Sequence, residues 1–223
     1  MARNGYTKVL IVDEQPIYSL GLASLLESCK KFSIAGITSG INDAMRIAEK
    51  EKPALVFLEI RLGNENGMEL ISKLKILNPQ IIIVVLSAND EQFFSERVLR
   101  MGARGYIMKS SSADIILDAI NTVMDGRIYL SENERDRIFQ AITGENSSGK
   151  KDWIGSMQKL SNREIQVFNL IGKGYGTIEI ASMFNISTKT IDSHKEHLKL
   201  KLHCTTSQEL RQLAIEWTKI NEK

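Results

Sequence analysis

The stretch Leu55-Val56-Phe57-Leu58-Glu59 is an apolar run that ends in a carboxylate, and it decides how the first half of the chain is interpreted. Three more apolar runs also end in polar residues. Residues 9–12 precede Asp13 and Glu14, residues 81–86 precede Ser87, and residues 105–108 precede Lys109. Such short runs are typical of strands buried in a parallel sheet. Because parallel strands present their carboxyl ends at one edge, we expect these polar side chains to converge on one small site.

Apolar residues at helical spacing separate these strand-like runs. The segments with this spacing are residues 17–26, 41–48, 68–77, 93–101 and 115–123. Strand and helix signals alternate five times. This alternation predicts an α/β domain over residues 5–127, with a doubly wound, five-stranded parallel sheet.

Composition sets outer bounds on the function. The chain has 223 residues, a net charge of +2 and two cysteines far apart in sequence, so no disulfide framework is expected. The N-terminus has no long apolar stretch, which predicts a cytoplasmic protein without a secretory or membrane segment. Residues 159–223 hold ten Lys and Arg against seven Asp and Glu, a small excess that favours an anionic partner for this part.

The second half of the chain has a different organisation. Residues 128–156 are predicted to be a connecting helix and linker, with the helix at residues 131–142 presenting Ile138, Phe139 and Ile142 on an apolar face. Residues 143–152 are polar and without periodicity, as in linkers. No strand pattern follows residue 158, so residues 157–223 are predicted to form a smaller all-α domain of four helices.

The residues at the strand ends suit phosphoryl transfer to a carboxylate. That chemistry uses a Mg²⁺ ion held by acidic residues, a lysine that pairs with the phosphate, and a hydroxyl that bonds to it. The chain here resembles the receiver domain of two-component response regulators over about its first 125 residues. The matching motifs are Val12-Asp13-Glu14, Leu58-Glu59, Leu86-Ser87-Ala88 and Gly105-Tyr106-Ile107-Met108-Lys109.

The resemblance assigns a role to each of these residues. Glu59 occupies the phosphoacceptor position, and Asp13 and Glu14 form the acidic pocket. Ser87, Tyr106 and Lys109 form the switch and phosphate pocket, with Tyr106 as the swinging aromatic. No cofactor is expected to be required, although Mg²⁺ can be expected to bind weakly at the three carboxylates.

Glu59 departs from the family pattern, in which receivers that relay phosphate carry aspartate. Glutamate is one methylene longer, which displaces its carboxylate by roughly 1.5 Å. A 1 Å misplacement can cost about a hundredfold in rate, so ordinary phosphotransfer is predicted to be lost. Two interpretations remain open. Glu59 imitates the phosphorylated state, or it merely pairs with Lys109 and leaves an inactive site.

The C-terminal helices resemble the LuxR-type DNA-binding domain. Ser161 and Glu164 have the spacing of a capping box, and two short helices joined by a tight turn at residues 185–187 form a helix-turn-helix layout. The matching motifs are Leu160-Ser161-x-Arg163-Glu164, Ile180-Ala181, Ile186-Ser187-x-x-Thr190-Ile191-x-x-His194 and Lys201-Leu202. Together with the receiver, the chain resembles a response regulator of the NarL/FixJ type.

By that resemblance, the helix from Thr188 enters the major groove of DNA. Its candidate DNA-binding residues are Thr188, Lys189, Thr190, Asp192, Ser193, His194, Lys195, Glu196, Lys199 and Lys201. The lysines are predicted to contact phosphates, while Asp192, Ser193 and Glu196 are predicted to face base edges.

Three other signals have plainer interpretations. His194, His197, His203 and Cys204 lack a second pair of ligands at zinc-finger spacing, so a zinc site is not expected. The glycine-rich residues 172–176 read as a helix-ending turn, because no strand precedes them. An exposed Trp217 in the last helix would mark a dimer surface.

The sequence therefore predicts a homodimeric, DNA-binding transcription regulator that is not an enzyme and does not depend on phosphorylation. A sensor kinase or another regulatory protein is an expected partner, and no membrane is. A normal switch that tolerates Glu59 is one alternative. A receiver-based protein–protein adaptor with weak or no DNA binding is another, and the acidic Asp192 and Glu196 favour it.

Overall fold

The structure is a computed structural model that describes residues 6–63, 65–143, 156–157 and 159–221. The chain divides into two compact units, Met1–Glu145 and Asn146–Lys223. Each unit has its own hydrophobic core, and each is described separately below.

The first unit is built on the predicted five-stranded parallel sheet. Its strands are β1 (Thr7–Val12), β2 (Phe32–Thr38), β3 (Leu55–Leu58), β6 (Ile82–Ser87) and β7 (Gly105–Met108), in the order β2-β1-β3-β6-β7. The doubly wound fold is confirmed. Four of these strands coincide with the apolar runs of the sequence, whereas β2, at the edge of the sheet, buries only Phe32 fully and gives no such run.

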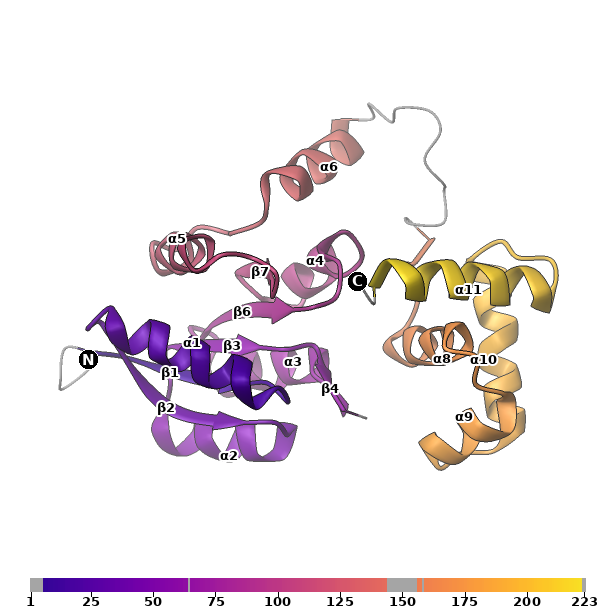
Figure 1. Cartoon of the computed structure of the whole chain (residues 1–223), viewed down its shortest axis with the longest axis horizontal. Helices are drawn as coiled ribbons and strands as arrows, with labels where there is room; N and C mark the ends of the chain where they lie inside the picture. Colours follow the sequence, from indigo (N-terminus) through magenta and orange to yellow (C-terminus); the bar gives the residue numbers. More distant parts are fainter. Residues whose placement is uncertain (1–5, 64, 144–155, 158, 222–223) are drawn as a thin grey trace. The chain divides into compact units, whose positions relative to one another are not determined.

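Helices cover both faces of this sheet (Figure 1). They are α1 (Pro16–Ser28), α2 (Ile41–Glu51), α3 (Met68–Leu77), α4 (Glu91–Arg100) and α5 (Ala113–Met124). One core cluster joins α1 and α5 to the sheet, with Leu26 and Ile120 packed against Val9 and Phe57. Leu10, whose side chain points to the opposite face, is fully buried as well.

A small hairpin that the sequence did not indicate follows the central strand. It consists of β4 (Arg61–Leu62) and β5 (Glu65–Asn66), which pair antiparallel between Glu59 and α3. Gly67 closes the hairpin against the sheet edge. A Cβ atom at Gly67 would lie 2.3 Å from the backbone oxygen of Glu59, so only glycine fits. The hairpin is thereby held beside the candidate site.

The predicted extra helix exists as α6 (Glu132–Thr143) and belongs to the first unit, where it contacts α4. The prediction that Phe139 lies on a buried apolar face is wrong, because this residue is 71% exposed. The side chain of Ile142 lies outside the described residues. The buried residue is Glu134, which accepts a hydrogen bond from Ser95 of α4 and pairs with Arg137 at 2.7 Å. Polar contacts therefore fix α6. Residues 144–155 of the predicted linker lie outside the described residues.

The second unit contains the predicted helices α8 (Asn162–Gly172), α9 (Thr177–Phe184), α10 (Thr188–Lys201) and α11 (Ser207–Asn221). Gly174, with φ of +92°, follows α8 in the predicted helix-ending turn, and Asn185 ends α9 with φ of +53°. Trp217 packs against Phe168 with ring centroids 6.1 Å apart and is only 2% exposed. The idea that Trp217 forms a dimer surface is therefore wrong, because its ring completes the core of this unit.

Candidate functional site

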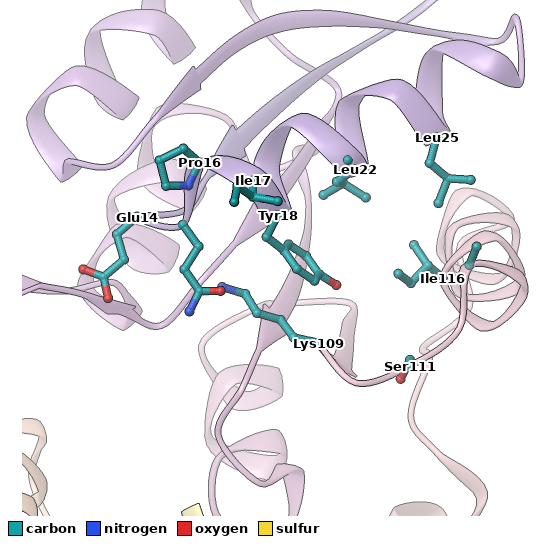
Figure 2. Close-up of a pocket in the computed structure, with 12 residues that line it drawn as sticks. Glu14, Pro16, Ile17, Tyr18, Leu22, Leu25, Lys109, Ser111 and Ile116 are labelled. Atoms are coloured by element: carbon teal, nitrogen blue, oxygen red, sulfur yellow. The ribbon is translucent and has the colours of Figure 1, made fainter. Parts of the chain in front are cut away.

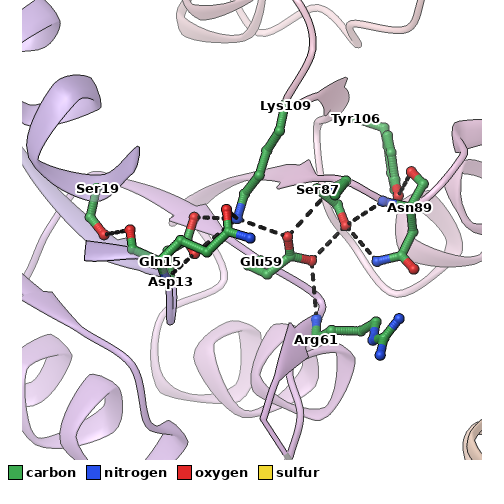
Figure 3. Close-up of polar contacts among 10 residues, drawn as sticks. Asp13, Gln15, Ser19, Glu59, Arg61, Ser87, Asn89, Tyr106 and Lys109 are labelled. Carbon is green, nitrogen blue, oxygen red and sulfur yellow. Dashed lines mark hydrogen bonds and ion pairs between the residues drawn. The ribbon is translucent and has the colours of Figure 1, made fainter. Parts of the chain in front are cut away.

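Four side chains converge at the carboxyl edge of the sheet in the first unit, from the ends of β1, β3, β6 and β7. They are Asp13, Glu59, Ser87 and Lys109 (Figure 3). The two carboxylates are 6% and 5% exposed, and the serine is fully buried. The parallel strands therefore bring these groups together as the sequence predicted: Glu59 contacts Ser87 and Lys109, and Lys109 also contacts Asp13.

Both oxygens of the Glu59 carboxylate are in contact with donor groups. Its Oε1 accepts a 2.5 Å bond from Ser87 Oγ and a 3.1 Å bond from the backbone N–H of Arg61. Its Oε2 lies 3.1 Å from Lys109 Nζ and 3.4 Å from the backbone nitrogen of Ala88. The extra methylene of glutamate thus carries the carboxylate up to the hydroxyl and the ammonium.

Lys109 joins the two carboxylates. Its ammonium lies 2.7 Å from Asp13 Oδ2 and 3.1 Å from Glu59 Oε2, and it donates a 3.1 Å bond to Gln15 Oε1. The ammonium also lies over the ring of Tyr18, 4.9 Å from its centroid (Figure 2). The lysine side chain is only 7% exposed, so these charges meet where water screens them little. Gln15 and Tyr18 were not identified from the sequence, since neither residue ends a strand.

Ser87 connects Glu59 to a second buried group. Its oxygen accepts bonds from the backbone and side-chain nitrogens of Asn89 at 3.2 and 2.9 Å. Tyr106 is fully buried and donates a 2.8 Å bond to the backbone oxygen of Asn89. Burial raises the pKa of Tyr106 well above its usual value, so the phenol stays neutral and donates. A chain of bonds therefore runs from Glu59 through Ser87 and Asn89 to Tyr106 (Figure 3).

In the second unit, α10 has an inner apolar edge and an outer polar face. Ile191 and Leu198 are buried, whereas Thr188, Lys189, Thr190, Asp192, Ser193 and Glu196 are exposed. Ser187 caps the helix by accepting a 3.1 Å bond from the backbone of Thr190. The predicted base-facing residues therefore share the outer face, as a helix that enters a groove requires.

Three of the four predicted phosphate-contacting lysines have partners within the unit. Lys195 donates to Thr177 Oγ1, Lys199 pairs with Glu196 at 2.9 Å and is 18% exposed, and Lys201 pairs with Glu164 at 2.7 Å. Lys189 is exposed on the first turn of α10. Among these four residues, Lys189 is therefore the best placed to meet a phosphate.

Two family models match the chain. The model "Response regulator receiver domain" covers residues 9–121, and the model "Bacterial regulatory proteins, luxR family" covers residues 158–214. The first alone spans half of the chain. The chain belongs to the NarL/FixJ-type response regulators.

Known proteins agree with this assignment. The virulence regulator BvgA of Bordetella pertussis is 31% identical over 209 residues, which are 94% of this chain and 97% of BvgA. The oxygen regulatory protein NreC of Staphylococcus aureus (strain JH9) is 27% identical over 93% of this chain and 96% of its own length. A structure of the RcsB response regulator of Salmonella typhimurium has a TM-score of 0.69, with 22% identity over 96% of this chain and 99% of that one.

The receiver site of this response regulator does not fit the predicted Mg²⁺ ion in the arrangement seen. The ammonium of Lys109 lies against both Asp13 and Glu59, and Glu14 is exposed. Within the part of the chain that the structure describes, no three His, Cys, Asp or Glu residues form a group that could hold a metal ion. Magnesium binding stays a prediction.

Glu164 connects the start of α8 to the end of α10 in the LuxR-type unit. Its carboxylate accepts a 2.6 Å bond from the backbone of Ser161, completing the predicted capping box, and two bonds from Lys201 at the end of α10. Burial acts to raise the pKa of Glu164, but the bonds from Lys201 and Ser161 outweigh it and lower this pKa. The charged form of Glu164 therefore stabilises the folded unit.

Glu164→Gln is expected to destabilise the second unit by about 1 kcal/mol at pH 7, because a charge-assisted bond to a half-exposed lysine is lost. Since the folded-state pKa is lowered, this stabilisation is present above the unfolded pKa and disappears as pH falls through the folded value. The difference between wild type and variant should shrink below about pH 4.5. Urea unfolding of the isolated residues 156–223, in which Trp217 is the one tryptophan, measures it by fluorescence.

Glu179→Gln is the matched control, because Glu179 caps the next helix from an exposed position by accepting a 2.7 Å bond from Gly176. Its effect should be smaller, because no lysine pairs with Glu179 in the contacts described above. Equal effects of the two substitutions would contradict the role of the Lys201 pair.

Among the helices in the described ranges, none has the length and apolar character needed to span a membrane.

Proposed function

We propose that this response regulator controls transcription with its receiver held in the active arrangement by Glu59, so that DNA binding needs no phosphoryl donor. The observation that carries the proposal is the set of contacts of the Glu59 carboxylate. They are the 2.5 Å bond from Ser87, the 3.1 Å ion pair with Lys109 and the 3.4 Å approach of the Ala88 amide.

These donors are the types that a phosphorylated carboxylate would use in the same pocket. A phosphoryl oxygen is stabilised by a hydroxyl, an ammonium and a backbone N–H, each of which bonds to negative charge. Glu59 places a fixed negative charge against all three. The bond from Ser87 also holds that hydroxyl beside Glu59, while Tyr106 lies buried behind it. This arrangement favours imitation of the phosphorylated state over simple inactivity.

The same contacts argue against phosphoryl transfer to Glu59. Both of its oxygens already accept bonds, and the carboxylate extends into the space that an incoming phosphoryl group would need. Lys109 also holds Asp13, the residue that would bind a metal. A nucleophile displaced by roughly 1.5 Å from its in-line position is expected to react very slowly.

The output of this switch is DNA binding by α10. Support comes from the exposed outer face of α10 and from the luxR-family match over residues 158–214. Solved structures of the similar protein RcsB include complexes with promoter DNA and dimers bound to DNA. We infer that this chain binds promoter sites as a homodimer in the cytoplasm, with Asp192, Ser193 and Glu196 facing base edges.

An isolated fragment of the second unit, residues 156–223, is expected to bind promoter duplexes. Lys189→Glu is expected to weaken its binding to every duplex by a similar factor of about five. Because phosphate contacts carry no sequence information, this change should also lower the slope of log affinity against log salt by about one. Ser193→Ala should instead change the preference among duplexes. Gel shifts over a range of salt concentrations measure both.

Lys219→Glu is the matched control, since it makes the same charge change at an exposed position of α11, away from α10. If Lys189→Glu and Lys219→Glu acted equally, α10 would not be the contact surface. If the folded fragment bound no duplex at low salt, the adaptor hypothesis would replace the hypothesis of DNA binding.

A further inference from the structure

The outer face of α10 presents hydrogen-bond acceptors at the positions proposed to face base edges. Asp192 and Glu196 are exposed carboxylates one helical turn apart, and a carboxylate can only accept bonds. The exposed hydroxyl of Ser193 donates a 3.1 Å bond to the backbone oxygen of Lys189, so its proton is used within the helix and its lone pairs remain for an outside donor. A base edge that meets this face therefore meets three acceptors.

The two carboxylates differ in how far the protein neutralises them. Glu196 pairs with Lys199 at 2.9 Å, and the lysine side chain is only 18% exposed. Within the described residues, the exposed carboxylate of Asp192 has no ion pair and no hydrogen bond. Asp192 therefore keeps its full charge and both of its oxygens for a group outside the chain.

The donors of the major groove decide which base suits such an acceptor. Only cytosine, through its N4 amino group, and adenine, through its N6 amino group, present donors there, whereas guanine presents two acceptors and thymine an acceptor and a methyl group. The amino group of adenine has the N7 acceptor beside it, which repels a carboxylate, and that of cytosine has a C5–H group instead. Cytosine is therefore the base that an unpaired carboxylate on this face prefers.

We propose that Asp192 sets the sequence preference of this regulator by accepting a hydrogen bond from the N4 amino group of one cytosine in each half-site. This role of Asp192 rests on the proposed function, in which α10 of each protomer enters the major groove. Glu196 contributes less, because Lys199 already offsets its charge. Asp192 also acts against other sequences, since guanine or thymine at that position would leave its desolvated charge without a donor.

Binding to unrelated DNA is expected to be weak for the same reason. Asp192 and Glu196 repel the phosphates that flank the groove, and three of the four candidate lysines of α10 are bonded within the unit. A duplex with the wrong base therefore recovers little of the cost of bringing Asp192 into the groove. The result is discrimination between sites rather than affinity for any duplex.

The test selects duplexes from a pool with a randomised central region, using full-length wild type, Asp192→Asn, Asp192→Ala and Glu196→Gln. Wild type is expected to require a C·G pair at one position of each half-site. Asp192→Asn should select an A·T pair there, because an amide bonds to both N6 and N7 of adenine. Asp192→Ala should accept any pair at that position. Glu196→Gln is the matched control and should keep the C·G pair, since it removes a carboxylate from the same face.

A change to the DNA itself tests the group that is contacted. In the selected duplex, the cytosine of that pair is replaced by 2-pyrimidinone, which differs only in lacking the amino group at C4. Wild type should bind this duplex about tenfold more weakly, the size expected for one hydrogen bond to a charged group. Asp192→Ala should show no loss beyond the effect of the weaker base pair, which both proteins experience. Fluorescence anisotropy measures these affinities.

Three outcomes would overturn the inference while the proposed function stands. Wild type, Asp192→Asn and Asp192→Ala would select the same duplexes, or the position that changes would carry an A·T pair in the wild-type selection, or wild type and Asp192→Ala would lose equally on the 2-pyrimidinone duplex. Loss of the C·G preference in Glu196→Gln alone would transfer the role to Glu196 and equally overturn it. Failure of wild type to select any duplex would overturn the proposed function, and this inference with it.

Discussion

Glu59→Asp is expected to be labelled by acetyl phosphate and Mg²⁺ at least about a hundredfold faster than the wild type, which should take no stable phosphate. Shortening the side chain by one methylene withdraws the carboxylate by roughly 1.5 Å from Ser87 and Lys109. That withdrawal opens the space that an incoming phosphoryl group needs, and in-line transfer is sensitive to errors of this size. Intact-protein mass spectrometry with excess acetyl phosphate measures the labelled fraction directly.

Glu59→Gln provides the control for this labelling, because it keeps the length of the side chain and removes the charged nucleophile. It should remain unlabelled. Rapid, stoichiometric labelling of wild type at Glu59 would contradict the account, since it would show that the longer carboxylate still reacts.

The placement of the receiver site could be predicted because strand geometry dictates it. A polar residue directly after a buried parallel strand must emerge at the carboxyl edge, and this placed Asp13, Glu59, Ser87 and Lys109 together. The helix-turn-helix was equally predictable. The capping box of Ser161 and Glu164 and the helical spacing of apolar residues are local signals, and the structure retains both.

Contacts that depend on side-chain direction in three dimensions could not be predicted in this way. Asn89 lies in a polar loop with no periodicity, yet its side-chain amide donates a bond to Ser87 and its backbone oxygen accepts one from Tyr106. Trp217 shares a helix with exposed residues, and only the packing of α11 on α8 shows that its ring is buried. Lys201 matched the DNA-binding motif by sequence, but its ammonium bonds to Glu164.

A separate prediction is that Glu59 acts through its charge. Full-length Glu59→Gln is therefore expected to bind DNA about twentyfold more weakly than the wild type. Glutamine can still accept the bond from Ser87 through its one carbonyl oxygen, but its NH2 group then faces Lys109 and the Ala88 amide, so the active arrangement loses its ionic contact. A coupling of this size lies within the 5- to 150-fold typical between linked sites. A group shifts such an equilibrium only through its different interactions with the two states.

The decisive measurement compares full-length wild type, full-length Glu59→Gln and the isolated second unit on one promoter duplex at fixed salt, with and without acetyl phosphate. The account predicts that wild type binds the duplex about as tightly as the isolated unit, and that acetyl phosphate does not change its affinity. Glu59→Gln should bind about twentyfold more weakly, within the usual range of coupling between sites. Equal affinities of wild type and Glu59→Gln would contradict the account, as would tightening of wild-type binding by the phosphoryl donor.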